Sequence, residues 1–321
     1  MGDDRTVLVT GAAGFIGSHV VERLLARGDR VVGLDNFDDF YPRSAKERNL
    51  ATAHGVKGFE LVEGDIRDAA LIRRLLDGRR VGSILHLAAR AGVRPSIAQP
   101  ELYADVNVRG TAAIFEAARQ AGLRKVVYAS SSSVYGARAI PPFREDGDVD
   151  HPVSPYAATK RACELLAHTY HHLYGMDLVG LRFFTVYGPR QRPDMAIHRF
   201  TRLIDEGRPA VVYGDGSAQR DFTYIDDIVQ GVLAALDRAQ GLAIYNLGES
   251  ATTSVAELVG MIGVALGKTP RVERRPPEPG DVPLTFADVS HARAELGYDP
   301  QVPLRDGLAR FVAWRRSEAA R

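Results

Sequence analysis

The chain has 321 residues, 45% of them hydrophobic and 25% charged, with a formal net charge of +1 at pH 7. This length supports a large buried core and two domains or lobes, and the balanced charge argues against a broad basic surface for nucleic acid. Because there is no apolar run of about 18 residues and no N-terminal signal-peptide pattern, a cytoplasmic protein without membrane partners is expected.

The first predicted element is a buried strand at residues 6–10, a short apolar run rich in β-branched residues. A glycine pattern follows at once in Gly11-Ala-Ala-Gly14-Phe-Ile-Gly17, and a helical pattern continues to about residue 27. Strand, glycine turn and helix in this order predict a dinucleotide phosphate site. Gly11 allows a tight turn, Gly14 lets the backbone approach a pyrophosphate, and Gly17 lets the helix pack close to the sheet. The helix N-terminus adds amide donors and a positive dipole end.

A second predicted strand at 30–34 ends at Asp35, near the spacing expected for an acid that binds the adenosine ribose. A carboxylate at this place suits a ribose diol and repels a 2′-phosphate, so NAD is favoured over NADP. The alternative interpretation is a plain turn with a solvent-facing aspartate.

Further short apolar strands are predicted at 59–62, 83–87 and 125–129. Helical stretches separate them, and this repeated order predicts an α/β fold with a doubly wound parallel sheet. Ligands bind at the carboxyl ends of such strands. Asp65 and Ile66 are therefore candidates for the adenine side, and Ala88 and Ala89 are small enough to let a cofactor pass close.

Tyr156-Ala-Ala-Thr-Lys160 places a phenol and an ammonium one turn apart on a predicted helix, so that both point the same way. A neighbouring cation favours the phenolate form, and such a tyrosine can exchange a proton with a sugar or alcohol hydroxyl. Alone, the pattern is weak, and the alternative is an exposed helix face with an extended lysine.

The glycine turn, the serine-rich strand end Ser130-Ser-Ser-Ser-Val-Tyr135 and the Tyr156–Lys160 pair, in this order, resemble the extended short-chain dehydrogenase/reductase superfamily over essentially the whole chain. Within it, the chain looks most like the nucleotide-sugar 4-epimerases. The UDP-glucuronate 4-epimerase group is the most similar, through Leu181-Arg-Phe-Phe-Thr-Val-Tyr-Gly-Pro-Arg190 and Arg192-Pro-Asp-Met195. A further family block runs from Arg220 to Asp227.

The resemblance implies a Rossmann domain with a smaller α/β C-terminal lobe that binds the substrate. It also implies a catalytic set formed here by Ser131, Tyr156 and Lys160, with Lys160 binding the nicotinamide ribose as well. The predicted contacts of the cofactor are Gly11, Gly14, Phe15, Ile16, Gly17, Asp35, Asn36, Asp65, Ile66, Leu87, Ala88, Ala89, Asn107, Tyr156 and Lys160.

The residues beside Ser131 bear on the reaction. In the family, 4,6-dehydratases carry an Asp-Glu pair just after the catalytic hydroxyl, and UDP-glucuronate decarboxylases carry a glutamate near the same place, where this chain has Ser132 and Ser133. No acid is therefore placed to eliminate water or assist loss of CO2. The simplest remaining path oxidises C4 to a 4-keto sugar and returns the hydride to the opposite face, with a tightly bound NAD regenerated in each turnover.

A sugar carboxylate needs charge or several hydroxyl donors. Arg192 matches the uronate-recognising arginine of the family, and Thr185, Ser132 and Ser133 match hydroxyls that face the carboxylate. Arg94 is a second possible basic contact. Neutral UDP-glucose or a UDP-pentose stays open as substrate, and a non-catalytic NAD-binding scaffold is the remote alternative.

The nucleotide half of the substrate is assigned to the C-terminal lobe by the resemblance. Tyr213 matches the segment beside the uracil, Arg220 the arginine at the diphosphate, and Asp281 an aspartate at the ribose. Glu278 stands where many relatives carry an arginine, which leaves a nucleotide other than UDP open.

The first lobe is expected at 1–180 with a return near 222–246, and the second at 181–221 and 247–321. In relatives, helices that match 108–121 and 155–174 form a four-helix interface, so a homodimer is expected. Cys163 is the single cysteine, and the histidines show no metal-ligand spacing, so no metal site is expected.

Overall fold

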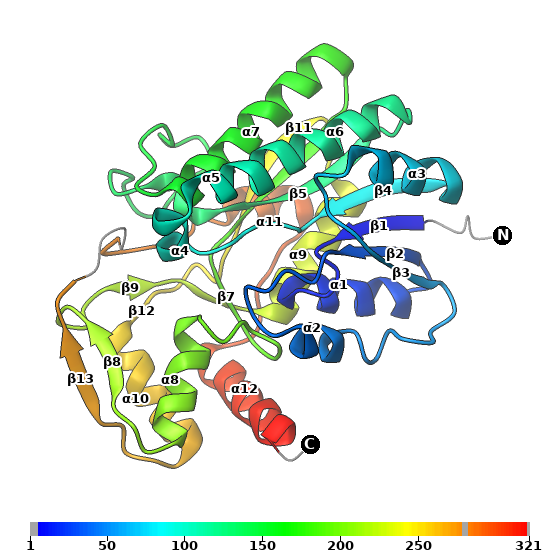
Figure 1. The fold of residues 1–321 in the computed structure, drawn as a ribbon. Coiled ribbons are helices and arrows are strands. Elements are labelled where there is room, and N and C mark those ends of the chain that lie inside the picture. Colours follow the sequence, from blue (N-terminus) through cyan, green and yellow to red (C-terminus); the bar gives the residue numbers. More distant parts are fainter. Residues whose placement is uncertain (1–5, 278–281, 320–321) are drawn as a thin grey trace.

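The computed structural model of the protein describes residues 6–277 and 282–319. Its centre is a seven-stranded sheet with the order β11-β6-β5-β4-β1-β2-β3, and each neighbouring pair is parallel (Figure 1). The strands are β1 (Thr6–Thr10), β2 (Arg30–Asp35), β3 (Phe59–Glu63), β4 (Val81–His86), β5 (Lys125–Ser131), β6 (Asp177–Phe183) and β11 (Leu242–Leu247). The predicted α/β fold with a parallel, doubly wound sheet is confirmed.

Helices cover both faces of this sheet (Figure 1). One layer contains α3 (Ala69–Arg79), α6 (Gly110–Gln120) and α7 (Pro155–Tyr174), and the other contains α1 (Phe15–Ala26), α2 (Arg43–Asn49) and α9 (Ile225–Arg238). Ahead of α6 the chain runs through α4 (Val93–Ala98), α5 (Pro100–Tyr103) and a π-helical turn, η1 (Ala104–Arg109). The helix expected from residue 108 is therefore the end of a longer helical stretch.

Alternation along β1 explains why both faces are covered. Val7 and Val9 belong to the core with α1 and α9, whereas Leu8 between them belongs to the core with α3 and α6. Successive side chains of a strand point to opposite faces, so a strand that is apolar throughout must be covered on both sides. All three side chains are fully buried, and burying each stabilises the fold by about 1.5–3 kcal/mol.

The second lobe is built from short strand pairs and helices (Figure 1). The pairs are β7 (Thr185–Tyr187) with β10 (Phe222–Tyr224), β9 (Gln219–Arg220) with β12 (Thr253–Ser254), and β8 (Ala210–Tyr213) with β13 (Val272–Arg275). Its helices include α8 (Ala196–Asp205), α10 (Val255–Leu266) and α12 (Leu304–Ala319). Helix α10 begins with a capping box, in which Ser254 and Glu257 satisfy each other's backbone amides, so its start is fixed locally.

The first lobe is formed by two separate stretches of the chain. After the β10 strand, α9 packs on α1 and β11 joins the sheet beside β6, while α11 (Ser290–Leu296) packs on α9. The boundary expected at residue 180 falls inside β6, and β11 ends one residue beyond the expected return. We therefore propose the first lobe as the part through Phe183 together with 225–247.

Within 6–277 and 282–319, no helix is both long and apolar enough to span a membrane. The same residues contain no group of three or more His, Cys, Asp or Glu side chains arranged to hold a metal ion.

Candidate active site

A cavity of about 380 Å³ opens at the carboxyl edge of the sheet, between the sheet and the second lobe. Its volume lies in the usual range of small-molecule sites, about 300–1,000 Å³. Every predicted cofactor residue except Asn107 lines it, as do the three predicted catalytic residues and the four predicted sugar contacts Ser132, Ser133, Thr185 and Arg192. The topology thus brings together residues that are scattered from Gly11 to Arg192 in the sequence.

The glycine turn between β1 and α1 is tightly packed. Gly11 has a positive φ of 70°, and a Cβ on it would lie 2.8 Å from the backbone nitrogen of Ala88. A Cβ on Gly17 would lie 2.0 Å from the carbonyl oxygen of Gly11, so only glycine fits there. Helix α1 begins at Phe15 with Gly14 as its N-cap residue, and its first three residues line the cavity with amides that have no partner within the helix. This cradle fits the pyrophosphate of the NAD that the sequence predicts.

Asp35 is buried, with 7% of its surface exposed, which excludes the alternative of a solvent-facing aspartate. Its carboxylate accepts hydrogen bonds from the backbone amides of Ala13 at 3.0 Å and Phe37 at 2.9 Å. Burial raises the pKa of Asp35, and the nearby Lys46 ammonium opposes that rise. Each carboxylate oxygen has a second lone pair, so Asp35 can hold the glycine turn and still accept ribose hydroxyls.

Asn107 lies outside the cavity, and its side chain is engaged elsewhere. Its Oδ1 accepts from the Arg90 amide at 2.7 Å, and its Nδ2 donates to the Arg90 carbonyl at 3.0 Å and to Thr159 Oγ1 at 3.0 Å. It is 1% exposed. Asn107 therefore ties the loop after β4 to α7, and its predicted contact with the cofactor stays a prediction.

The catalytic candidates meet where β5 ends and α7 begins. The Lys160 ammonium donates to the Ala129 carbonyl at 2.8 Å and lies 6.0 Å from the centre of the Tyr156 ring. Ser131, the last residue of β5, accepts from the Ser133 amide at 3.2 Å. Helix α7 is capped by Ser154, whose hydroxyl accepts from the Ala157 amide at 3.1 Å. The cap fixes the first turn, on which Tyr156 sits.

A buried ion pair that was not predicted from the sequence lies next to the candidate catalytic residues. Glu164 Oε1 accepts from Arg182 Nε at 2.9 Å and from the Ser130 hydroxyl at 2.6 Å, and Glu164 Oε2 accepts from Arg182 Nη2 at 3.0 Å. Arg182 is 1% exposed and Glu164 is 3% exposed. Glu164 follows Lys160 by one helical turn, and this spacing was the signal that could have revealed it.

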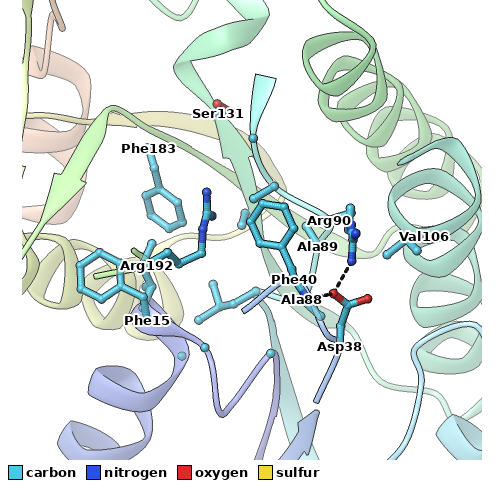
Figure 2. A pocket seen from close by; sticks show the side chains of 18 of the residues that line it. Phe15, Asp38, Phe40, Ala88, Ala89, Arg90, Val106, Ser131, Phe183 and Arg192 are labelled. Atoms are coloured by element: carbon cyan, nitrogen blue, oxygen red, sulfur yellow. Dashed lines mark hydrogen bonds and ion pairs between the residues drawn. The ribbon is translucent and has the colours of Figure 1, made fainter. Parts of the chain in front are cut away.

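Arg192 reaches into the sugar side of the cavity from the loop before α8 (Figure 2). Its Nε and Nη2 both donate to the Asp194 carboxylate at 2.9 Å. Its guanidinium carbon lies 5.3 Å from the centre of the Phe40 ring. Asp38, Phe40 and Tyr41, in the loop after β2, also line the cavity and were not predicted. Their position just after a strand end was the available signal.

Three predicted substrate contacts lie outside the cavity. Arg94, on α4, stacks on Tyr213 of β8 with its guanidinium carbon 4.5 Å from the ring centre, and Arg199 lies 5.7 Å from the same ring. Arg220 donates to the carbonyl of Gln219 at 2.8 Å. These side chains come from both lobes and are not among the residues that line the cavity. Asp281 and Glu278 lie outside the described residues.

Comparisons with known proteins agree with this arrangement. The fold and the cavity define an extended short-chain dehydrogenase/reductase. The chain belongs to the family described as GDP-mannose 4,6 dehydratase, whose model matches residues 8–311.

Two curated relatives cover nearly all of this chain. UDP-glucuronate 4-epimerase 2 of Arabidopsis thaliana is 45% identical over an alignment of 327 positions, which covers 96% of this chain and 75% of that protein. UDP-glucuronate 4-epimerase of Thermodesulfobacterium geofontis is 42% identical over 310 residues, which is 96% of this chain and 95% of that protein.

A solved structure is similar over the whole length. The UDP-glucuronic acid 4-epimerase from Bacillus cereus, in complex with UDP-glucuronic acid and NAD, is 37% identical and superposes with a TM-score of 0.92. The match covers 98% of this chain and 99% of that one.

Proposed function

We propose that the protein is an NAD-dependent UDP-sugar 4-epimerase that interconverts UDP-glucuronate and UDP-galacturonate. The observation that carries this proposal is the shared cavity of the glycine turn and Ser131, Tyr156 and Lys160, with serines at 132 and 133 where an acid would be needed for elimination. Relatives at 42–45% identity named UDP-glucuronate 4-epimerases support the same activity.

Proton transfer is assigned to Tyr156. In the phenolate form it takes the proton of the sugar O4 hydroxyl, and the Lys160 ammonium stabilises that form through its charge. Ser131 donates a hydrogen bond to O4, which stabilises charge on that oxygen as the O–H bond breaks. NAD, held by the glycine turn and Asp35, would supply the acceptor and donor of the C4 hydride.

Loss of one proton and one hydride converts the C4 carbinol to a 4-keto sugar. The keto sugar then presents its other face, C4 regains the hydride, and Tyr156 returns the proton to O4. The atoms balance with C4 inverted and no net redox change. Ser132 and Ser133 supply hydroxyls but no carboxyl group, so the cavity wall at that point provides no acid for loss of water.

Recognition of the C6 carboxylate is assigned to Arg192 with Thr185, Ser132 and Ser133. Asp194 engages the Nε–Nη2 edge of Arg192, and no partner of Nη1 is found within 6–277 and 282–319. The opposite edge of the guanidinium is therefore available for a second carboxylate.

The Arg192–Asp194 pair also favours a second candidate. Because Asp194 neutralises the arginine, a neutral sugar meets less unbalanced charge here than it would beside an unpaired arginine. UDP-glucose or a UDP-pentose is therefore the alternative substrate. A non-catalytic scaffold is disfavoured by the intact Ser131, Tyr156 and Lys160.

The assignment of uridine rests on Tyr213 and Arg220 and includes Asp281. We also propose a homodimer through α6 and α7. It is supported by apolar side chains exposed on α7, since Leu165, Leu173 and Tyr174 are each at least half exposed.

The cytoplasmic location stays a prediction.

The test is an epimerisation screen of the purified holoenzyme with UDP-glucuronate, UDP-glucose and UDP-xylose, read by NMR of the products. The proposal expects UDP-galacturonate from UDP-glucuronate at the highest kcat/KM. Preferential inversion of UDP-glucose would favour the neutral candidate, and no inversion of any sugar would revive the scaffold.

A further inference from the structure

The loop after β2, residues 36–42, lines the cavity, and Figure 2 shows its Phe40 ring between Arg90 and Arg192. The ring of Phe40 has the guanidinium carbon of Arg90 5.0 Å from its centre and that of Arg192 5.3 Å from its centre. Arg90 follows β4 in the first lobe, whereas Arg192 precedes α8 in the second. One aromatic ring thus contacts a cation from each lobe.

Phe40 is itself held on the first lobe. The Asp38 carboxylate accepts from the Phe40 amide at 2.9 Å and forms an ion pair with Arg90, drawn as a dashed line in Figure 2. Lys46 donates to the Asp38 carbonyl at 2.7 Å. Arg90 is bonded through its backbone to Asn107. The ring is therefore a fixed support rather than a loose loop side chain.

Arg192 is constrained on one edge and on its flank. Asp194 takes two donors on the Nε–Nη2 edge, and Phe40 packs against the guanidinium. A guanidinium is planar and binds a carboxylate bidentately only when its plane is set correctly. The exposed Asp194 lies only two residues from Arg192, so this ion pair alone would still let the Arg192 side chain rotate. The Phe40 ring restricts that rotation.

We propose that Phe40 is a specificity-determining residue that orients Arg192 for the carboxylate of a uronate. This inference rests on the proposed function, because it needs a sugar carboxylate at Arg192. Phe40 acts through Arg192 and takes no part in proton or hydride transfer. Its effect should therefore appear in the preference for a charged sugar over a neutral one.

The test compares Phe40→Leu, which removes the ring, with Phe40→Tyr, which keeps it. The expected result is a fall of about tenfold in the ratio of kcat/KM for UDP-glucuronate to that for UDP-glucose in the leucine variant, carried mainly by KM. The tyrosine variant should restore the ratio. Calorimetric binding of UDP-glucuronate, UDP-glucose and UDP gives the same comparison without turnover.

Phe37→Leu is the matched control. Phe37 lies in the same loop and also carries a cation on its ring, with the Arg43 guanidinium carbon 4.4 Å away, but it does not line the cavity. Its replacement should leave the substrate ratio unchanged. Thermal denaturation of all variants separates a folding defect from a change of preference.

A double-mutant cycle tests whether Phe40 acts through Arg192. In an Arg192→Ala background, Phe40→Leu should change the ratio no further, because the residue through which it acts is gone. Equal losses on both sugars, or loss of bound NAD from Phe40→Leu, would overturn the inference and make Phe40 a cofactor contact.

Failure of the role of Phe40 and failure of the proposed function give different results. If the wild type inverts UDP-glucuronate and Phe40→Leu keeps the wild-type ratio, only the inference fails. If the wild type inverts no UDP-sugar, the proposed function fails and the inference with it.

Discussion

The Ser130 hydroxyl donates to the Glu164 carboxylate at 2.6 Å, and this bond joins the end of β5 to the middle of α7. Ser131 follows Ser130 on the strand, and Lys160 precedes Glu164 by one turn on the helix. Arg182 neutralises Glu164 from β6, the next strand of the sheet. A buried, charge-assisted contact thus helps to fix the separation of Ser131 and Tyr156, the proposed catalytic hydroxyl and base.

Ser130→Ala should lower kcat about tenfold with little change in KM. A hydrogen bond to a charged group contributes about 1.5–3 kcal/mol, and a looser fit between Ser131 and Tyr156 affects the transition state more than substrate binding. Steady-state kinetics with UDP-glucuronate measures both constants. Ser217→Ala, which removes a comparable bond to Asp215 on the surface of the second lobe, is the control. A normal kcat in Ser130→Ala would remove the positioning role.

Tyr156→Phe should reduce turnover by about 10²–10⁴-fold, because the proton acceptor for O4 is lost. The ring remains, so NAD should stay bound, as measured by absorbance of the cofactor released on denaturation. Tyr174→Phe, at the end of the same helix and half exposed, should be fully active. Near-normal turnover of Tyr156→Phe would exclude it as the base.

Arg192→Ala should lower kcat/KM for UDP-glucuronate about 10–100-fold more than that for UDP-glucose. The basis is the loss of a charge-assisted contact to the carboxylate that the neutral sugar does not make. Parallel assays of the two substrates provide the ratio. Equal losses would remove the carboxylate assignment and favour the neutral candidate.

Gly17→Ala should destabilise the fold by about 1–3 kcal/mol and abolish retention of NAD. The added Cβ would lie 2.0 Å from the Gly11 carbonyl oxygen, so the glycine turn or α1 must shift. Urea unfolding and cofactor content are the measurements. Gly260→Ala is the matched control, because that helical glycine has open space around it and alanine there should stabilise by about 0.5–1 kcal/mol.

His86 should make stability fall in acid. Burial lowers the pKa of His86 from its ordinary 6.5 to about 3, and the ring lies between the hydroxyls of Thr10 at 2.7 Å and Thr111 at 3.0 Å. Below pH 6.5 the unfolded chain therefore binds a proton that the folded chain does not. This contribution is fully present above pH 6.5 and falls by about 1.4 kcal/mol per pH unit on the way to pH 3.

Urea unfolding at pH 7 and pH 5.5 tests this point. His86→Asn should show a smaller drop between the two conditions than the wild type. His54→Asn, at an exposed histidine outside the cavity, should keep the wild-type drop. The same drop in His86→Asn as in the wild type would contradict the assignment.

Local patterns predicted the parts of the site whose geometry is itself local. The turn from Gly11 to Gly17 and the acid at the end of β2 follow from a strand, a turn and a helix in sequence, and Asp35 indeed closes on that turn. Tyr156 and Lys160 share a face because a helix places every fourth residue there.

The other parts of the site depend on tertiary contacts, which local sequence patterns do not reveal. Asn107 sits at a position that the family resemblance assigns to the cofactor, yet Arg90 and Thr159 take its amide. Arg94 meets Tyr213 only because α4 and β8, from different lobes, lie together. No local sequence pattern predicts the role of Phe40 either. Its contact with Arg192 joins residues some 150 positions apart and depends on how the two lobes pack together.

The most direct test of the central claim is the fate of UDP-glucuronate in the presence of the purified holoenzyme, followed by NMR of the sugar ring. The account predicts UDP-galacturonate with C4 inverted, C6 retained as a carboxylate, and no accumulation of reduced cofactor. Loss of CO2 or water, or an unchanged sugar, would contradict it.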